Sequence, residues 1–273
     1  MPLDEVVTTA DQQAINRAFS KQSAGYDTAD EKSIILQDLR HQVYRHVERF
    51  LQPQSRLLEL NAGTGIDAMY FVSSGHRVHA TDVSDGMINQ IQKKISIHSL
   101  SDRLSCQQVS YADLDQVAEE PFDYVFSNFG GLNCIRDLSM VTKNLGKLVK
   151  QGGYVTWVIM PPICPWELMW LIKGKMKQAF RRLAKGGVMA HVEGEYFRTY
   201  YHSLKQVRSA FGDAFRLIRV EGLAALSPPP HASEFPIKHP ATYKLLRNID
   251  GAACNTFPFN RWADHLIVTF QFK

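Results

Sequence analysis

The chain has 273 residues, of which 45% are hydrophobic and 21% are charged, and its formal net charge is +4. These values are typical of globular proteins and exclude fibrous and disordered classes, and the net charge is too small to indicate nucleic-acid binding. The four cysteines form no C-x-x-C pair and have no histidine at metal-ligand spacing. We therefore expect free thiols in a reducing compartment and no metal site.

The N-terminal region lies outside the repeating pattern of the rest of the chain. Residues 1–16 carry three acidic side chains and lack the basic start and apolar run of a signal peptide, so we expect a cytoplasmic protein. Residues 1–50 are predicted as helices that form a lid, with Phe19, Ile35 and Leu39 among the inward groups.

From Arg56 onward, short apolar runs alternate with helical patterns, which is typical of a parallel sheet covered on both faces. Strands are predicted at 56–60, 77–81, 104–109, 124–127, 154–160, 215–222 and 265–272. Helices are predicted at 67–73, 85–97, 137–148, 166–183 and 242–249, and Ser84 is expected to cap the second of them. The core then comprises 51–160 and 214–273. Residues 161–213 are predicted as a cap inserted after the fifth strand, above the edge where open α/β sheets bind ligands.

The strongest motif is a buried strand that runs into a glycine loop, Leu58-Glu59-Leu60-Asn61-Ala62-Gly63-Thr64-Gly65. Glycine allows a sharp turn and brings backbone amides close to a ligand. Asp82 ends the next strand, about 20 residues further on, where a carboxylate can accept hydrogen bonds from both ribose hydroxyls of an adenosine.

The spacing of this loop leaves two kinds of cofactor open. Gly63, Gly65 and Ala68 also fit the G-x-G-x-x-G/A pattern of dinucleotide-binding oxidoreductases, so an NAD(P)-dependent enzyme is one alternative. Glu59 favours the other cofactor, because a carboxylate beside the loop would repel a pyrophosphate but tolerate a sulfonium and an ammonium group.

These motifs resemble those of class I S-adenosylmethionine-dependent methyltransferases that act on small molecules. Besides the glycine loop, the resemblance includes Thr81-Asp82-Val83-Ser84, Tyr111-Ala112-Asp113, Phe122 to Asn128 and Leu148 to Gly153, and it covers roughly residues 50–160. Asn61 stands where the family usually has its first glycine, and asparagine tolerates left-handed geometry. The resemblance implies a Rossmann-like, doubly wound αβα fold with seven strands, the last of them antiparallel.

The resemblance also implies a set of binding residues for S-adenosylmethionine, with S-adenosylhomocysteine as the product. The loop residues Glu59, Asn61, Ala62, Gly63, Thr64 and Gly65 would approach or support the methionine part. Asp82 would bind the ribose, Val83 and Met87 would flank the adenine, and Ala112 and Asp113 would read its edge. Ser127 and Asn128 would lie near the reacting methyl group. Tyr26 either covers the cofactor, as in the lid helix of similar small-molecule enzymes, or is a packing aromatic.

Methyl transfer is an in-line displacement in which positioning supplies much of the acceleration. If the acceptor is a hydroxyl or an acid, a base would help, and His191, His202 and Tyr201 of the cap are candidates. A surface histidine and a packing tyrosine are the alternative interpretations. A protein that kept the fold and binds the cofactor without turnover is a further alternative, because fold does not determine function.

The densest positive segment is 173–185, with Trp166 and Trp170 close by. A basic amphipathic segment with tryptophans can rest on an anionic membrane or hold an acidic or lipid-like acceptor, although such a segment is usually a solvated face. We expect a small-molecule acceptor and no nucleic-acid partner. The sequence does not define the methylated atom or the oligomeric state.

Overall fold

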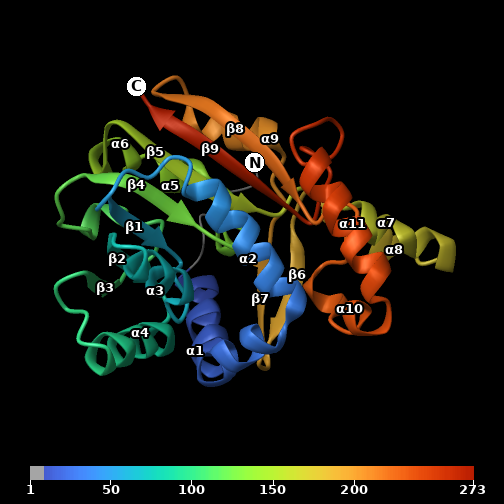
Figure 1. Ribbon diagram of the computed structural model, residues 1–273, viewed down its shortest axis with the longest axis horizontal. Coiled ribbons are helices and arrows are strands. Elements are labelled where there is room, and N and C mark those ends of the chain that lie inside the picture. The colour runs from blue at the N-terminus through green and yellow to red at the C-terminus, as the bar shows by residue number, and fades with distance from the viewer. Residues whose placement is uncertain (1–8) are drawn as a thin grey trace.

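A seven-stranded sheet forms the centre of the computed structural model, which describes residues 9–273. The strand order is β3-β2-β1-β4-β5-β9-β8 (Figure 1). The bounds are β1 Arg56–Leu60, β2 Arg77–Asp82, β3 Leu104–Gln108, β4 Phe122–Ser127, β5 Val149–Ile159, β8 Phe215–Leu223 and β9 His265–Phe272.

The direction of the strands confirms the predicted fold class. β3, β2, β1, β4 and β5 pair in parallel, and β9 runs antiparallel to both β5 and β8. β5 begins five residues earlier than predicted. Phe122 pairs with Val149 whereas Tyr124 pairs with Tyr154, so residues 150–153 bulge out of the ladder.

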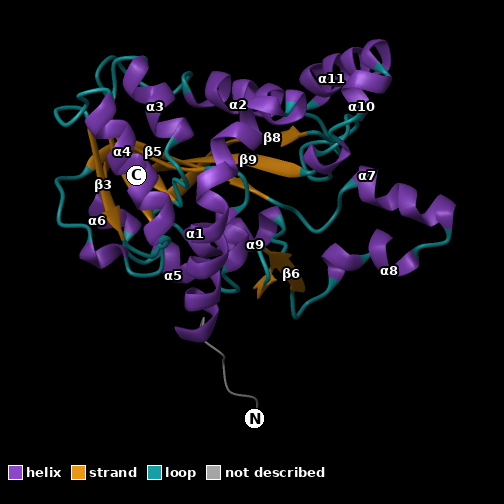
Figure 2. Ribbon diagram, turned by 90° about the horizontal axis from the view of Figure 1, so that it is seen from below, coloured by secondary structure: helices purple, strands orange, loops and turns teal. Residues whose placement is uncertain are grey.

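The helices cover both faces of the sheet (Figure 2). Their bounds are α1 Thr9–Lys32, α2 Ile34–Val47, α3 Ile66–Ser73, α4 Asp85–Ile97, α5 Ser139–Thr142, α6 Leu145–Leu148, α7 Pro165–Leu168, α8 Met176–Ala179, α9 Leu204–Phe211, α10 Phe235–Lys238 and α11 Pro240–Ala253. Ser84 caps α4 as predicted, because its hydroxyl accepts from the amide of Met87. No helix among residues 9–273 is long and apolar enough to cross a membrane.

Two of the predicted helices are broken. The prediction over 137–148 is replaced by the two single turns α5 and α6. The prediction over 166–183 is replaced by α7, the 3-10 turns η3 (Met169–Lys173) and η4 (Arg181–Leu183), and α8. Gly174 adopts a left-handed φ of 67°, which ends η3 and prevents a continuous helix.

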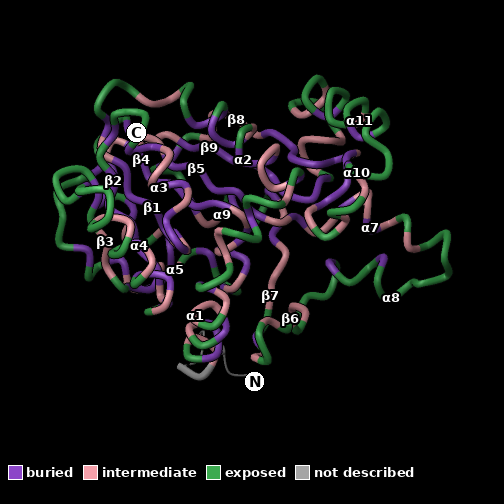
Figure 3. Tube along the Cα trace, turned by 60° about the horizontal axis from the view of Figure 1, so that its bottom comes forward, coloured by how far each residue is buried: buried purple, intermediate pink, exposed green. Residues whose placement is uncertain are grey.

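Alternate strand residues face two separate apolar clusters, as the pleat of a strand requires. Leu58 and Leu60 of β1 pack into the cluster on the α5 and α9 side, which includes Val141 and Val207. Leu57 packs on the opposite face with residues of α2, α3 and α4, such as Leu39, Phe71 and Ile91. The central strands are therefore buried on both faces (Figure 3).

The segments outside the alternating core have different surroundings. Residues 1–8 of the predicted lid lie outside the described residues. Within the rest of the lid, α2 packs on the sheet, whereas α1 packs against α4 and against β7. The predicted cap contains a hairpin of β6 (Val188–Val192) and β7 (Glu195–Thr199), and also α9, whose Val207 and Phe211 join the core.

α1 and α4 approach each other most closely at a glycine. A Cβ atom built on Gly86 would lie 2.6 Å from the Cα atom of Ser20. The hydroxyl of Ser20 accepts from the Gly86 amide at 3.1 Å and lies 2.8 Å from the Ser84 hydroxyl. Glycine is required here because the two backbones touch.

We predict that Gly86→Ala lowers the free energy of unfolding by about 1 to 3 kcal/mol, because the new methyl group overlaps the backbone of Ser20. The matched control is Gly25→Ala in α1, where a Cβ atom meets nothing within 4 Å. That change should be neutral or stabilising by up to about 1 kcal/mol, since alanine favours helix. Urea unfolding of both variants checks the contact, and equal effects would contradict it.

His202 lies buried just before α9, with 3% of its surface exposed. Its Nε2 atom is 2.9 Å from the carbonyl oxygen of Ile135, and its backbone amide donates to the carbonyl of Met160 at 3.1 Å. Burial lowers the pKa of His202 to about 4. The ring is therefore neutral in the folded protein at pH values where an unfolded histidine is already protonated.

We predict that His202 makes the protein less stable as the pH falls from about 6.5 to 4. In that window the unfolded chain binds a proton that the folded chain does not, so the loss from this group is about 1.4 kcal/mol per pH unit. In urea titrations over this range, His202→Gln should flatten the slope, whereas the exposed His191→Gln should keep it. An unchanged slope in His202→Gln would contradict the buried, neutral state.

Candidate functional site

The glycine loop connects β1 to α3 at the carboxyl edge of the sheet, as predicted. Asn61, Gly63 and Gly65 all have positive φ angles, of 47°, 57° and 79°. The asparagine in place of the first glycine therefore adopts the left-handed conformation that this residue tolerates.

The side chain of Asn61 also ties the loop to the end of β4. Its Oδ1 atom accepts from the Ser127 hydroxyl at 2.8 Å, and its Nδ2 atom donates to the carbonyl of Asn128 at 3.2 Å. Gly131 lies so close that a Cβ atom there would be 2.3 Å from Nδ2 of Asn61. This packing fixes the loop against the neighbouring strand.

A cleft with about 1090 Å³ of empty space, part of it open to solvent, lies over this loop. About 280 Å³ of this space can hold water-sized molecules, which is near the lower end of the range for ligand sites. Nine of the predicted cofactor residues line it: Tyr26, Asn61, Ala62, Gly63, Thr64, Asp82, Val83, Met87 and Asn128.

Five other predicted cofactor residues do not line the cleft. Gly65 caps α3, and Ser127 is buried behind Asn61. Ala112 is buried and Asp113 precedes a 3-10 turn, although their neighbour Tyr111 does line the cleft. The role of Asp113 in reading the adenine edge stays a prediction.

Glu59, the fifth of these residues, is buried beneath the loop with 2% of its surface exposed. Its Oε2 atom has no hydrogen-bond partner among the described residues. Burial and the nearby carboxylate of Asp67 raise the pKa of Glu59 well above its usual value. An unpaired buried carboxyl is costly, so this position suits a cation or a polar ligand group that would complete it.

Asp82 holds the loop from the neighbouring strand. Its Oδ2 atom accepts from the Gly63 amide at 2.8 Å, and its Oδ1 atom accepts from the Ser84 amide at 2.9 Å. Burial raises the pKa of Asp82, and these amide hydrogen bonds act in the opposite direction. Each carboxylate oxygen keeps further acceptor capacity toward the cleft.

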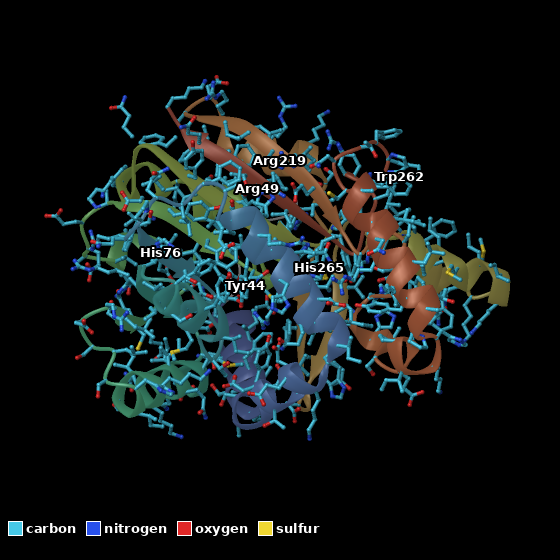
Figure 4. All side chains as sticks on the ribbon, viewed as in Figure 1. Tyr44, Arg49, His76, Arg219, Trp262 and His265 are labelled. Carbon is cyan, nitrogen blue, oxygen red and sulfur yellow. The ribbon has the colours of Figure 1, made fainter. Side chains whose placement is uncertain are left out.

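A buried polar network that the sequence reasoning missed lies beside the loop. Asp67 accepts from the Tyr44 hydroxyl at 2.5 Å, from Asn128 Nδ2 at 2.9 Å and from the Arg40 guanidinium. Arg40 also binds Asp30 at 2.9 Å. Tyr44 comes from α2 and lies near the centre of the molecule (Figure 4). The position of Asp67 two residues after Gly65 was a usable signal, but no local pattern marks Arg40.

The helix α1 closes one side of the cleft. The Lys94 ammonium binds Asp27 at 2.6 Å and the carbonyl of Thr64 at 2.8 Å, and the Thr64 hydroxyl donates to Asp27. These contacts tie α1 directly to the glycine loop. Tyr26, one residue before Asp27, lines the cleft, and burial raises its pKa.

The far part of the cleft is apolar and was also missed from the sequence. Phe19 of α1 and Phe197 of β7 meet there with ring centroids 5.7 Å apart. Further apolar lining comes from Ile15, Phe129, Met160, Ala190 and Val192, together with the thiol of Cys134. Because these residues come from distant parts of the chain, no sequence motif could have identified the group.

The three predicted catalytic residues lie outside the cleft. His191 is an exposed residue of β6 that stacks on Tyr196, with ring centroids 4.5 Å apart. His202 is buried against the carbonyl of Ile135. The guanidinium of Arg182 lies over the ring of Tyr201, 5.1 Å from the centroid of that ring. Of the described residues that line the cleft, none is a histidine.

One group of side chains among the described residues has the spacing of metal ligands, namely Cys164, Glu167 and Asp264. The Arg182 guanidinium already lies against both carboxylates, 2.8 Å from Glu167 and 2.6 Å from Asp264. The positive charge that this cluster requires is therefore supplied by the protein itself.

Part of the chain matches known proteins. Residues 57–153 match the family profile described as a methyltransferase domain. A ribosomal protein L11 methyltransferase from Desulfitobacterium hafniense is 28% identical over 109 residues, which are 39% of this chain and 34% of that protein. The match thus spans about a third of the length of this curated relative.

Solved methyltransferase structures share the fold at low sequence identity. A putative S-adenosylmethionine-dependent methyltransferase from Listeria monocytogenes is 15% identical with a TM-score of 0.56, over 84% of this chain and 96% of that chain. Magnesium protoporphyrin IX methyltransferase from Synechocystis PCC 6803, solved with bound SAH, is 14% identical with a TM-score of 0.55, over 96% and 100%.

The matched segment contains β1, the glycine loop, Asp82 and β4, which are the elements that build the cleft. The NAD(P)-dependent alternative has no comparable support from these matches. Residues 57–153 are therefore identified as a methyltransferase domain, and the chain has the fold of solved S-adenosylmethionine-dependent methyltransferases.

Proposed function

We propose that this protein transfers a methyl group from S-adenosylmethionine to a small acceptor with an apolar body. The observation that carries the proposal is the buried carboxyl of Glu59, whose Oε2 atom has no partner among the described residues and which lies beneath the glycine loop of a cleft lined by Asp82. Acidic groups at both positions suit a ligand with an ammonium group and ribose hydroxyls, and they disfavour a pyrophosphate.

Each end of the cofactor has a candidate partner in the cleft. Asp82 would accept from the ribose hydroxyls, and Glu59 would reach the amino group through a water molecule. Val83 and Met87 would flank the adenine, and Tyr26 would cover the ligand from α1. Asn128, whose amide is held by Asp67, would lie near the reacting centre.

When bound, S-adenosylmethionine supplies an electrophilic methyl group on a cationic sulfur. The protein's part is then to hold the acceptor in line and to exclude water, which is the main source of acceleration for such a displacement. The apolar wall around Phe19 and Phe197 serves both purposes.

The cleft also limits the kind of acceptor. The described lining has no histidine, Asp67 is paired with Arg40, and the ribose would occupy Asp82, so no base is left for the acceptor. We therefore propose an acceptor whose attacking atom has a free lone pair, so that no protein base has to remove a proton before the attack. A lipid-like small molecule with such an atom fits the apolar wall, whereas the charged backbone of nucleic acid does not.

We predict that Asp82→Asn weakens binding of S-adenosylhomocysteine roughly 10- to 100-fold, because charged hydrogen bonds to the ribose are lost. Binding of 5′-methylthioadenosine, which keeps the ribose but lacks the amino acid part, should weaken by a similar factor. Calorimetric titration of both ligands measures this, with circular dichroism as the folding control. Near-normal affinity for both would contradict the ribose assignment.

We predict that Glu59→Gln weakens binding of S-adenosylhomocysteine roughly 10-fold or more and leaves 5′-methylthioadenosine binding unchanged. The reason is that the carboxyl faces the ammonium group, which methylthioadenosine lacks. Comparing the two ligands separates a lost contact from general damage to the loop. Equal weakening of both ligands would show that Glu59 only supports the loop.

A further inference from the structure

The segment that carries α7, η3, α8 and η4 projects from one end of the molecule (Figures 1 and 2). It is mostly exposed along its length (Figure 3). The segment leads directly into β6, whose Ala190 and Val192 line the cleft. The projection is therefore adjacent, along the chain, to a strand that lines the cleft.

Large apolar side chains are concentrated on this projection. Fifteen such side chains are exposed among the described residues, and six of them lie between residues 169 and 183. The most exposed is Ile172 at 84%, followed by Met176 at 60%. Contiguous exposed apolar groups of this kind mark interaction sites, whereas single ones do not.

Beyond Glu167 at its base, the charged side chains of the projection are all positive. Residues 168–192 contain no aspartate or glutamate. Lys173, Lys175 and Lys177 are exposed, and none of them pairs with a carboxylate of residues 9–273. The ammonium groups of Lys173 and Lys175 lie 5.2 and 4.8 Å from the ring centroid of Trp170. Lysine, tryptophan and aliphatic side chains are thus presented together.

The base of the projection is anchored, in contrast to its tip. Arg181 and Arg182 both bind Glu167, at 2.7 and 2.8 Å, and Arg182 also binds Asp264 next to β9. Trp262, which lies at the same end of the molecule (Figure 4), borders a small cavity under the projection together with Leu183. The two arginines are therefore structural, and the three lysines remain available to a partner.

We propose that the tip of this projection, formed by Met169, Leu171, Ile172, Lys173, Lys175, Met176 and Lys177, docks on an anionic lipid membrane. The aliphatic and methionine side chains would enter the headgroup boundary, and the lysines would contact acidic lipids, which is the arrangement of interfacial segments. This docking goes beyond the proposed function and does not depend on it.

The combination of charge and apolar surface distinguishes a membrane from other partners. A second copy of the chain would bring three more lysines against these three, and the repulsion opposes such a dimer. Nucleic acid would satisfy the lysines but would leave Ile172 and Met176 exposed. An anionic bilayer satisfies both kinds of side chain at once.

The test is co-sedimentation of the full-length protein with vesicles of phosphatidylcholine alone or of an equimolar mixture with phosphatidylglycerol. The wild type should bind the mixed vesicles and bind pure phosphatidylcholine far more weakly, and salt should reduce the binding. Partition into mixed vesicles should fall roughly 100-fold or more in the triple variant Lys173→Glu/Lys175→Glu/Lys177→Glu. Ile172→Ser/Met176→Ser should lower it roughly 10-fold at unchanged net charge.

The matched control is Lys93→Glu/Lys143→Glu/Lys205→Glu, which changes the net charge equally at exposed lysines elsewhere. This control should bind mixed vesicles almost as well as the wild type. All variants should keep wild-type affinity for S-adenosylhomocysteine, which separates lipid docking from the cofactor site.

Three outcomes would overturn the proposal. The first is no binding of the wild type to mixed vesicles. The second is an equal loss in the tip and control triple variants, which would reduce the effect to net charge. The third is a wild-type dimer in sedimentation velocity that the Ile172→Ser/Met176→Ser change dissolves, which would make the tip a contact between copies of the chain.

Discussion

The buried ion pairs of Arg40 are the interaction on which the ligand cleft depends. This one guanidinium on α2 binds Asp30 near the end of α1 and Asp67 in the first turn of α3, directly after the glycine loop. A buried charge is costly unless all its partners are present, so the three helices hold their positions together. Asp67 also accepts a hydrogen bond from the side chain of Asn128, which extends the network to the end of β4. The loop therefore has fixed supports on both sides.

The same arrangement leaves the neighbourhood of the loop acidic. Glu59, Asp67 and Asp82 all lie beside it, and Arg40 is shared between two carboxylates. Burial, together with the carboxylate of Asp67, raises the pKa of Glu59, and its Oε2 atom has no hydrogen-bond partner among the described residues. A ligand with a positive charge relieves this excess, whereas a second anion would increase it. Electrostatics thus selects the kind of nucleotide ligand, although the backbone turn would accommodate either.

The two ends of the cleft follow different physical rules. Hydrogen-bonding groups from the sheet edge define the polar end, and aromatic and aliphatic groups from α1 and the β6–β7 hairpin define the other. The hairpin also continues the chain from the exposed projection at residues 165–183. The apolar wall of the cleft and the proposed docking surface are thus adjacent along the chain, which is consistent with the proposal of an acceptor that partitions into lipid.

The sequence by itself determined the parallel sheet, the position of the glycine loop and the acid at the end of β2. These features depend on local patterns, since strands alternate with helices and a tight turn needs residues such as Asn61 and Gly63 that tolerate positive φ. The prediction from local patterns was wrong where a single residue ends a helix, as Gly174 does within the predicted helix over 166–183. They also could not place His202, whose surroundings are set by the carbonyl of Ile135, 67 positions away.

Only the tertiary structure decided which side chains meet in the cleft. Arg40 and Asp67 are 27 positions apart and Phe19 and Phe197 are 178 apart, so no spacing rule connects them. Arg181 and Arg182 likewise pair with Glu167, so these two cations of the basic segment are already neutralised within the protein. The physical reason is that burial and charge compensation depend on neighbours in space, whereas propensity and periodicity depend on neighbours in the chain.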